Sequence, residues 1–279
     1  MQWTWGQLCG IFLTAVVSLL LGIAIQLDNT PADNEDWNFR MAESADSNKA
    51  SFQEKQQSAF VVGYTGEVGK ELVKELATSN IFSKVTLLGR RVVEYEDEKL
   101  KSLEQKVVDF DKLDEYEDLF KDHDVGFCCL GTTRGKSGVE GFKKVDHDYV
   151  LKTAELAKKT GCQHFNLLTS VGANKNSSFL YPRTKGLVES EITDLDFSRL
   201  SIYRPSMLLC DRTESRPGEW VLKKLLSPVT YLAPTAISVP TSTVAKAMVN
   251  NCVAPPGDKK VEIFENKAIH QISGTLKKK

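Results

Sequence analysis

Three residues in the second half of the chain have the types and spacing needed to reduce a carbonyl group: Ser170, Tyr181 and Lys185. Hydride addition leaves negative charge on the carbonyl oxygen, so a proton must arrive, and a phenol can supply it. A nearby ammonium favours the charged form of a phenol and makes proton exchange practical. Lys185 follows Tyr181 by four residues, so both face one side of a helix. We expect Tyr181 to be the proton donor or acceptor, Lys185 to assist it and bind the nicotinamide ribose, and Ser170 to hold the carbonyl oxygen.

A Tyr-x-x-x-Lys pair is a weak motif alone, and Tyr95 and Lys99 form a second one. That pair lies in an acidic segment with no hydroxyl residue at a strand end upstream, so we interpret it as incidental. The Tyr181 pair follows an apolar strand-like run, 165–168, that ends in Thr169 and Ser170. A surface tyrosine and lysine on an amphipathic helix is the alternative interpretation, and the upstream hydroxyls favour catalysis.

A glycine-rich turn between a strand and a helix predicts a dinucleotide site. The apolar run 59–62 is followed by Gly63, Gly66 and Gly69, and then by apolar residues at helical spacing. The first glycine permits a tight turn, the second permits close approach of a pyrophosphate, and the third permits helix–strand packing. The spacing is GxxGxxG rather than GxGxxG, so the context carries more weight than the motif.

The residues that follow the next two strands lie where the ribose and adenine of such a cofactor would bind. An NAD enzyme usually has an acidic residue after its second strand, whereas this chain has Arg90 and Arg91. Guanidinium groups suit a 2′-phosphate, so we expect NADPH rather than NADH. A third strand over 107–110 contains Asp109, which has two open interpretations: an acceptor for the adenine amino group or a helix cap.

The remaining pattern alternates strands and helices. The run 125–131 is apolar throughout, as in a buried parallel strand, and an expected helix over about 145–160 leads to the strand at 165–168. Another strand, 201–203, precedes a short C-terminal part. The sequence therefore predicts an α/β fold: a Rossmann-type, doubly wound parallel sheet with a small C-terminal substrate or cap region.

The N-terminal part differs in composition from this domain. Residues 8–27 are apolar and uncharged, which is long enough to span a bilayer, so residues 1–27 are an anchor or, alternatively, a signal peptide. Residues 28–57 are polar and are expected to be a linker, and 58–279 the NADP-binding domain.

Charge and cysteine content restrict partners and compartment. The net charge is −1, which excludes a nucleic-acid partner of the usual basic kind, and the four scattered histidines predict no metal site. Five of the six cysteines lie in the expected domain without a disulfide spacing. We therefore expect a membrane-anchored protein, in the endomembranes or nuclear envelope, whose domain faces the cytosol and whose sequon at Asn176 is unmodified.

From about Ser58 to its end the chain resembles the atypical short-chain dehydrogenases/reductases. The resemblance is carried by FSKVTLLGRR (82–91), VVDF (107–110), HDVGFCCLGTTRGK (123–136), HFNLL (164–168), LLCDRTESRPGEW (208–220) and ENKAIH (265–270). It implies an NADP-dependent oxidoreductase with Tyr181 as proton donor or acceptor. The residues that it implies as NADPH ligands are Thr65, Gly66, Glu67, Arg90, Arg91, Leu130, Gly131, Tyr181, Lys185, Leu208 and Arg216.

Two functions remain open at this point. The first is NADPH-dependent reduction of an unknown small carbonyl compound, which the intact Ser170, Tyr181 and Lys185 favour. The second is an NADPH-binding regulatory protein with little turnover, because the resemblance also implies partners of the importin β class of nuclear transport receptors. The short C-terminal part, about 219–279, offers little material for a deep substrate domain and favours the second function.

Overall fold

The computed structural model describes residues 22, 26, 45–210 and 234–275. The described strands are β1 (Ser58–Val62), β2 (Lys84–Gly89), β3 (Glu104–Val107), β4 (Val125–Cys128), β5 (His164–Leu168), β6 (Arg199–Arg204), β7 (Met207–Leu209), β8 (Ser238–Pro240) and β9 (Val261–Glu265). The described helices are α3 (Ala45–Glu54), α4 (Glu67–Ser79), α5 (Glu98–Lys101), η1 (Phe110–Phe120), α6 (Arg134–Lys143), η2 (Lys144–Asp148), α7 (Tyr149–Lys159), α8 (Leu180–Asp194), α10 (Pro234–Ile237), α11 (Thr241–Val253) and α12 (Asn266–Ile272).

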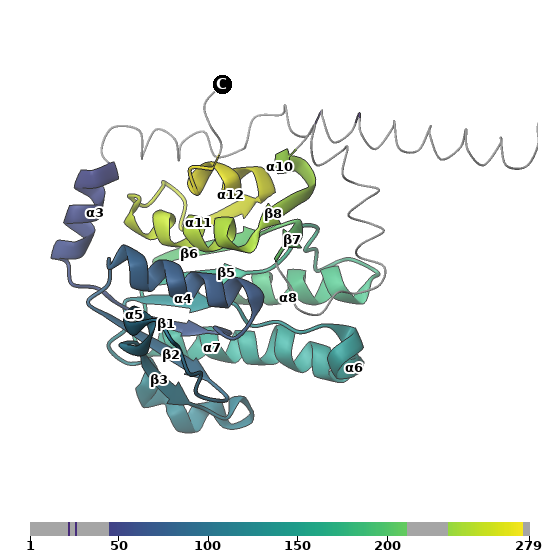
Figure 1. Ribbon diagram of the computed structural model, residues 1–279. Helices are drawn as coiled ribbons and strands as arrows, with labels where there is room; N and C mark the ends of the chain where they lie inside the picture. The colour runs from purple at the N-terminus through teal and green to yellow at the C-terminus, as the bar shows by residue number, and fades with distance from the viewer. Residues whose placement is uncertain (1–21, 23–25, 27–44, 211–233, 276–279) are drawn as a thin grey trace, which may run out of the picture.

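Seven of these strands form one parallel sheet in the order β3-β2-β1-β4-β5-β6-β9 (Figure 1). The strand order reverses between β1 and β4, where the chain returns to the sheet centre, and this is the switch point of a doubly wound fold. The expected fold class is confirmed. Outside this sheet and the helices that pack on it, the described C-terminal residues form the two-stranded β7–β8 sheet and α10.

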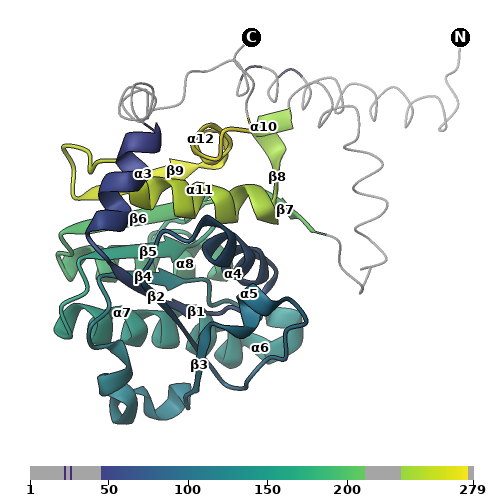
Figure 2. The ribbon, with the colours of Figure 1, turned by 60° about the vertical axis from the view of Figure 1, so that its left-hand side comes forward.

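The central strands are buried on both faces, which explains their continuous apolar runs. In β1, Ala59 and Val61 belong to the core on one face, and Phe60 and Val62 to the core on the other. Helices α4 and α11 cover the first face, and η1, α7 and α8 cover the second (Figures 1 and 2). Because the strands of this sheet are parallel, their carboxyl ends all lie at one edge.

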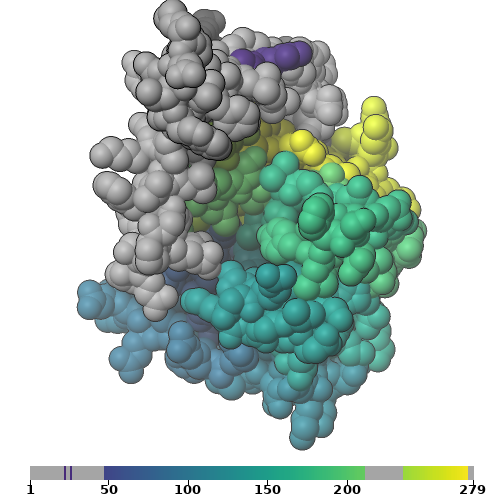
Figure 3. Space-filling model, turned by 90° about the vertical axis from the view of Figure 1, so that its right-hand side faces the viewer, coloured from purple at the N-terminus to yellow at the C-terminus, as the bar shows by residue number. Residues whose placement is uncertain are grey.

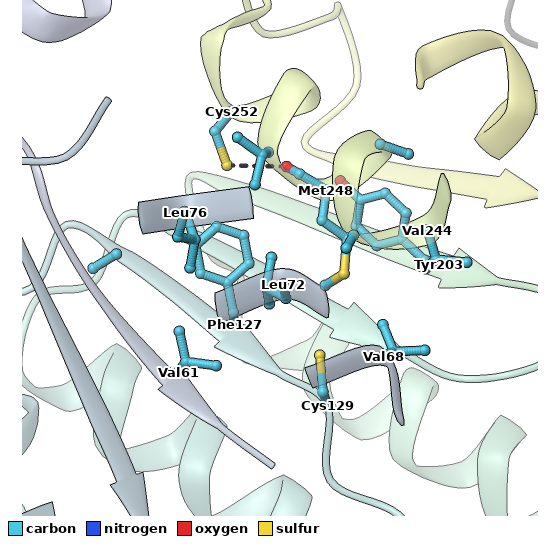
Figure 4. Packing of buried hydrophobic residues seen from close by; sticks show 14 of the residues in the cluster. Val61, Val68, Leu72, Leu76, Phe127, Cys129, Tyr203, Val244, Met248 and Cys252 are labelled. Atoms are coloured by element: carbon cyan, nitrogen blue, oxygen red, sulfur yellow. Dashed lines mark hydrogen bonds between the residues drawn. The ribbon is translucent and has the colours of Figure 1, made fainter. Parts of the chain in front are cut away.

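Helix α4 is held over the sheet by packing that extends to the C-terminal helix α11 (Figure 4). Its apolar face, with Val68 and Leu72, lies between Phe127 of β4 and Met248 of α11, and all four side chains are less than 5% exposed. The burial of such apolar side chains away from water is the main driving force for the docking of a helix. The C-terminal residues thus complete the nucleotide-binding half of the fold.

Part of the expected linker is helical in the structure. Residues Ala45–Glu54, which the sequence analysis placed in the polar segment 28–57, form α3. The helix has one buried apolar side chain: Phe52 is buried and its ring meets that of Phe82 edge-on, with centroids 5.3 Å apart. Gln53 also donates a hydrogen bond to the Asn80 carbonyl oxygen at 2.9 Å. The weak periodicity of α3 hid it, since a single apolar anchor produces no stripe. The segment 8–27 lies outside the described residues, apart from Gly22 and Gln26, and no described helix is long and apolar enough to cross a bilayer.

Two element boundaries differ from expectation. The helix expected to begin near Val145 is preceded by α6, which begins at Arg134 and is broken at Gly138, where φ is 70° and ψ is −174°. After this break the helix continues through η2, a π-helical stretch over Lys144–Asp148, into α7. Strand β3 covers Glu104–Val107 and shares only Val107 with the expected strand 107–110. It is largely polar because it lies at the sheet edge, where little is buried. Asp109 follows the strand and caps η1 by accepting a hydrogen bond from the Asp111 amide.

Candidate active site

The glycine turn lies at the carboxyl edge of the sheet, between β1 and α4. Gly63 has φ +79°, and a Cβ there would lie 2.4 Å from the carbonyl carbon of Cys129 in the neighbouring β4 segment. A Cβ on Gly69 would lie 2.2 Å from the Gly63 carbonyl oxygen, which leaves no room for a side chain. Gly66 has an ordinary extended backbone and directly precedes α4. The first and third glycines are thus required by packing, whereas Gly66 leaves open space in front of a helix N-terminus, where anions bind well.

A cavity of about 670 Å³ opens in front of this turn, within the range of typical cofactor sites. It brings together many of the predicted cofactor residues and adds several from η1, α6, η2 and α7. Its lining residues are Gly63, Tyr64, Thr65, Gly66, Gly89, Arg90, Arg91, Phe110, Cys129, Leu130, Gly131, Thr132, Lys136, Ser137, Val145 and Tyr149. Three of these are basic and none is acidic, so the lining suits a ligand that carries phosphate.

The two arginines are held at the cavity by a residue from the glycine turn. Tyr64 is buried beneath the end of β2, where a Cβ on Gly89 would meet its ring at 2.5 Å. Its hydroxyl donates a hydrogen bond to the Arg91 carbonyl oxygen. Burial raises the pKa of Tyr64, against the opposing effect of the Arg91 guanidinium, so the phenol stays protonated and keeps donating. Tyr64 therefore fixes the backbone from which Arg90 and Arg91 project.

The predicted catalytic residues lie near the same edge, after β5 and on α8. The Ser170 hydroxyl is buried and has no hydrogen-bond partner among the described residues, so it is available to a bound molecule. Lys185 is 4% exposed, whereas Tyr181, one turn earlier on α8, is 48% exposed. The Tyr181 ring stacks on Phe142 of α6, with centroids 5.6 Å apart. Figure 3 views the side on which α6 and α8 lie next to each other.

A buried polar network supports the end of β5. Thr169, which precedes Ser170, donates from its hydroxyl to Glu189 of α8 at 2.6 Å. The same carboxylate pairs with Arg204 at the end of β6, at 2.5 Å. Every member of this network has a charged or hydrogen-bonded partner, so it ties β5, β6 and α8 together. The position of the Ser170 backbone follows from these contacts.

The other predicted residues lie around the cavity or beyond it. Glu67 is in the first turn of α4 and pairs with Lys70 at 3.3 Å, while Gly69 packs beneath the turn. Leu208 is in β7 and packs against the apolar core, and Arg216 lies outside the described residues. Lys99 is in α5 and Tyr95 packs against the core near it, away from Ser170. In the described part of the chain, no cluster of His, Cys, Asp or Glu side chains is arranged to hold a metal.

Sequence reasoning missed two buried acids at this site, Glu189 in the network above and Asp146. Asp146, in the π-helical stretch η2, pairs with Lys185 at 2.8 Å, with side-chain exposures of 2% and 5%. It shares the inward face of its helical run with Val150, Ala154 and Ala157. An aspartate on an otherwise apolar helix face was the signal, because an acid is rarely buried there without a partner.

The residues present fit a dinucleotide. Gly63 and Gly69 bring β1, α4 and β4 close enough to form a backbone cradle, and the cavity in front of it has basic walls. A pyrophosphate would meet the α4 N-terminus, and the arginines after β2 would meet the adenosine end. The nicotinamide end would then point toward Ser170, Tyr181 and Lys185.

Comparisons with known proteins agree with this geometry. Residues 63–194 match a family model described as NAD(P)H-binding. Protein HTATIP2 of Rattus norvegicus is 54% identical over 221 residues, which cover 79% of this chain and 91% of the rat protein. Protein FMP52-1, mitochondrial, of Scheffersomyces stipitis is 33% identical over 226 residues, 77% of this chain and 98% of that protein.

Solved structures with the same fold share little sequence. MoeE5 in complex with UDP-glucose and NAD superposes with a TM-score of 0.56 at 14% identity, over 75% of each chain. UDP-glucose 4-epimerase from Thermotoga maritima has a TM-score of 0.56 at 14% identity, over 80% of this chain and 84% of that chain. On the strength of its sequence relatives and its Rossmann sheet, this chain belongs to the family of NAD(P)H-binding atypical short-chain dehydrogenases that includes rat HTATIP2.

Proposed function

We propose that this protein binds NADPH and reduces a small carbonyl compound, with Tyr181 as the proton donor. The observation that supports this most is the buried hydroxyl of Ser170 just after β5, which has no hydrogen-bond partner among the described residues and lies at the carboxyl edge where the basic cavity opens. A buried hydroxyl without a partner costs free energy, so its presence at the same edge of the sheet as a cofactor-sized cavity suits a group that binds a substrate oxygen.

The choice of NADPH over NADH rests on charge. The cavity lining after β2 contains Arg90 and Arg91, and no acidic side chain among the described residues lines this cavity. A carboxylate there would bind a free ribose 2′-hydroxyl, whereas guanidinium groups bind a 2′-phosphate in bidentate fashion.

Three side chains have separate roles in the proposed reduction of the carbonyl group. Reduced nicotinamide supplies a hydride to the carbonyl carbon when it is bound. Ser170 donates a hydrogen bond to the carbonyl oxygen and holds it in place, and Tyr181 donates the proton as negative charge develops there. Lys185 donates hydrogen bonds to the ribose next to the nicotinamide. Tyr181 is 48% exposed, so a substrate can approach this residue from solvent.

We also propose that residues 8–27 anchor the protein in a membrane with the domain facing the cytosol. The described cysteines are free thiols, and Cys128, Cys129, Cys162 and Cys252 are buried. Burial raises the pKa of Cys128 to about 12, as expected of an unreactive core residue rather than part of a disulfide framework. Fungal relatives carry "mitochondrial" in their names, which makes a mitochondrial membrane one candidate beside the endomembranes and the nuclear envelope.

A second candidate function is regulation through protein partners, such as transport receptors of the importin β class. The observation that favours it is the small size of the C-terminal region. In the described residues, α11, β9 and α12 complete the Rossmann layers, and β7, β8 and α10 remain for a substrate cap. Capture of such a receptor by the NADPH-loaded protein, and by its Tyr181→Phe variant equally, would support this function.

The test of NADPH binding uses the purified full-length protein. Mass spectrometry identifies any co-purified nucleotide, and titration calorimetry measures dissociation constants for NADPH and NADH. We expect Arg90→Ala/Arg91→Ala to weaken NADPH binding by about 10- to 100-fold, as expected for lost charge-assisted hydrogen bonds, and to leave NADH binding unchanged.

The matched control is Lys74→Ala/Lys121→Ala. It removes the same two positive charges from exposed sites that do not line the cavity, and it should leave both constants unchanged. Equal affinity of the unmodified protein for NADPH and NADH would refute the role of the arginines.

A further inference from the structure

The ion pair between Asp146 and Lys185 is among the most deeply buried in the described part of the chain. The Lys185 ammonium lies 2.8 Å from the Asp146 carboxylate, and the two side chains are 5% and 2% exposed. Burial of two charges costs solvation free energy that their mutual attraction often fails to recover. A pair placed at the edge of a cofactor cavity at such a cost needs a reason other than stability.

The second oxygen of Asp146 contacts the cavity wall. It accepts a hydrogen bond from the Thr132 amide at 2.7 Å, and Thr132 lines the cavity. A Cβ on Gly131 would lie 3.4 Å from Asp146 and 4.0 Å from the Lys185 ammonium. The carboxylate therefore bridges Lys185 to the segment after β4, and the absence of a side chain at Gly131 leaves the ammonium close to the cavity.

A different buried pair shows what a purely structural one looks like here. Arg199 pairs with Glu262 at 2.9 Å near the amino ends of β6 and β9, far along the strands from the cavity. It also donates to the Ala254 carbonyl and the Asn251 side chain, so its donors are used within the protein. Lys185, by contrast, has Asp146 as its charged partner among the described residues and keeps other N–H bonds for a ligand.

We propose that Asp146 is a positioning residue for cofactor binding. It holds the Lys185 ammonium against the segment after β4, so that the remaining N–H bonds point at the ribose beside the nicotinamide. The inference rests on the proposed function, since it assigns Lys185 to that ribose. The π-helical stretch η2 is the local device: it turns Asp146 inward at a point where a regular helix would continue, and such stretches often occur at functional sites.

The test compares two ligands that differ in the nicotinamide half. Adenosine 2′,5′-bisphosphate keeps the adenine, ribose and 2′-phosphate of NADPH but lacks the nicotinamide ribose. In the full-length protein, Asp146→Asn should weaken NADPH binding about tenfold and change binding of the bisphosphate less than twofold. Asparagine keeps the size of the side chain but cannot both accept from Thr132 and neutralise the ammonium.

Two further variants separate positioning from folding. Glu262→Gln breaks the other buried pair and should lower the melting temperature without changing the ratio of the two dissociation constants. Asp146→Asn/Lys185→Met removes both charges and should fold better than Asp146→Asn, because no unpaired charge is left buried. If Asp146 acts through Lys185, the double variant binds NADPH as weakly as Lys185→Met alone.

The outcomes are distinguishable. If Asp146→Asn changes the two dissociation constants by the same factor, or changes neither, the positioning role is overturned. The proposal that the protein binds NADPH is not affected by that result. If Asp146→Asn does not fold, a double variant that binds NADPH much more weakly than Lys185→Met overturns it as well. An unmodified protein that binds neither ligand overturns the proposed function and this inference together.

Discussion

The three glycines of the turn are expected to respond differently to substitution, because the structure gives each a different neighbour. The informative pair is Gly66→Val and Gly69→Ala. Gly66 has φ −78° and ψ 167°, a conformation that any residue adopts, and a Cβ there would lie 3.3 Å from the Gly63 carbonyl oxygen. Gly69 is helical, but its Cβ would lie 2.2 Å from the same oxygen and 2.7 Å from the Tyr64 Cα.

These distances set the expected stability changes. The contact at Gly66 requires a shift of a few tenths of an ångström, and the unfolded chain loses some freedom, so the net cost should be below ~1 kcal/mol. The contact at Gly69 is with backbone on two sides, and overpacking of that kind costs ~3 kcal/mol or more. For a domain of this size that corresponds to a decrease in melting temperature of about 6–12 °C.

NADPH binding should follow the opposite order, with the larger direct loss in Gly66→Val. A valine at position 66 places two methyl groups in front of the α4 N-terminus, where the pyrophosphate would accept hydrogen bonds. Loss of one or two charge-assisted hydrogen bonds should weaken the binding of NADPH by about 10- to 100-fold. Calorimetry gives the binding constant, and thermal unfolding without ligand gives the melting temperature. NADPH binding of Gly66→Val at unchanged affinity would refute the assignment of the turn to the pyrophosphate.

Other substitutions test the chemistry, the buried histidine and the topology. Tyr181→Phe should bind NADPH normally, because the ring still stacks on Phe142, and should not transfer hydride to any carbonyl compound that the unmodified protein reduces; turnover at the normal rate would exclude Tyr181 as proton donor. Burial lowers the pKa of His164 well below its usual value of 6.5, with a smaller contribution from Arg199. Only the unfolded chain then takes up this proton, so stability should be fully present above about pH 6.5 and fall by up to ~1.4 kcal/mol per unit below it. Urea unfolding at pH 7.5 and 5.5 should show a smaller loss for His164→Asn, and an equal loss would contradict this origin. Asn176 is exposed in the loop before Tyr181, and an endoglycosidase-sensitive gel shift that disappears in Asn176→Gln would place the domain in a lumen rather than the cytosol.

The sheet was predictable because its strands are buried on both faces. A run such as residues 59–62 contributes alternately to the two cores, so almost every position must be apolar, and such runs stand out in a sequence. The glycine turn was predictable for a related reason: Gly63 and Gly69 are held by backbone contacts that allow no side chain. Edge strand β3 and helix α3 lack both signals, since β3 buries little and Phe52 is the one buried apolar side chain of α3 among its described residues.

The site was only partly predictable, because its decisive contacts join residues far apart in sequence. Tyr64 reads as an unremarkable residue between two glycines, yet its ring underlies β2 and its hydroxyl holds the Arg91 carbonyl. Asp146 reads as one acid in a mixed helix, and its role depends on a π-helical stretch that no periodicity reveals. Both contacts follow from tertiary packing rather than local preference.

The segment after β4 connects the two halves of the candidate site. On one side, the peptide between Cys129 and Leu130 packs against Gly63, where any side chain would collide with it. On the other side, the Thr132 amide donates to Asp146, which holds Lys185. A shift of this backbone would therefore move the pyrophosphate cradle and the lysine together. Since close-packed backbone transmits displacement rather than absorbing it, a substitution at Gly63 should disturb the position of Lys185 as well as the turn, although the two residues are far apart in sequence.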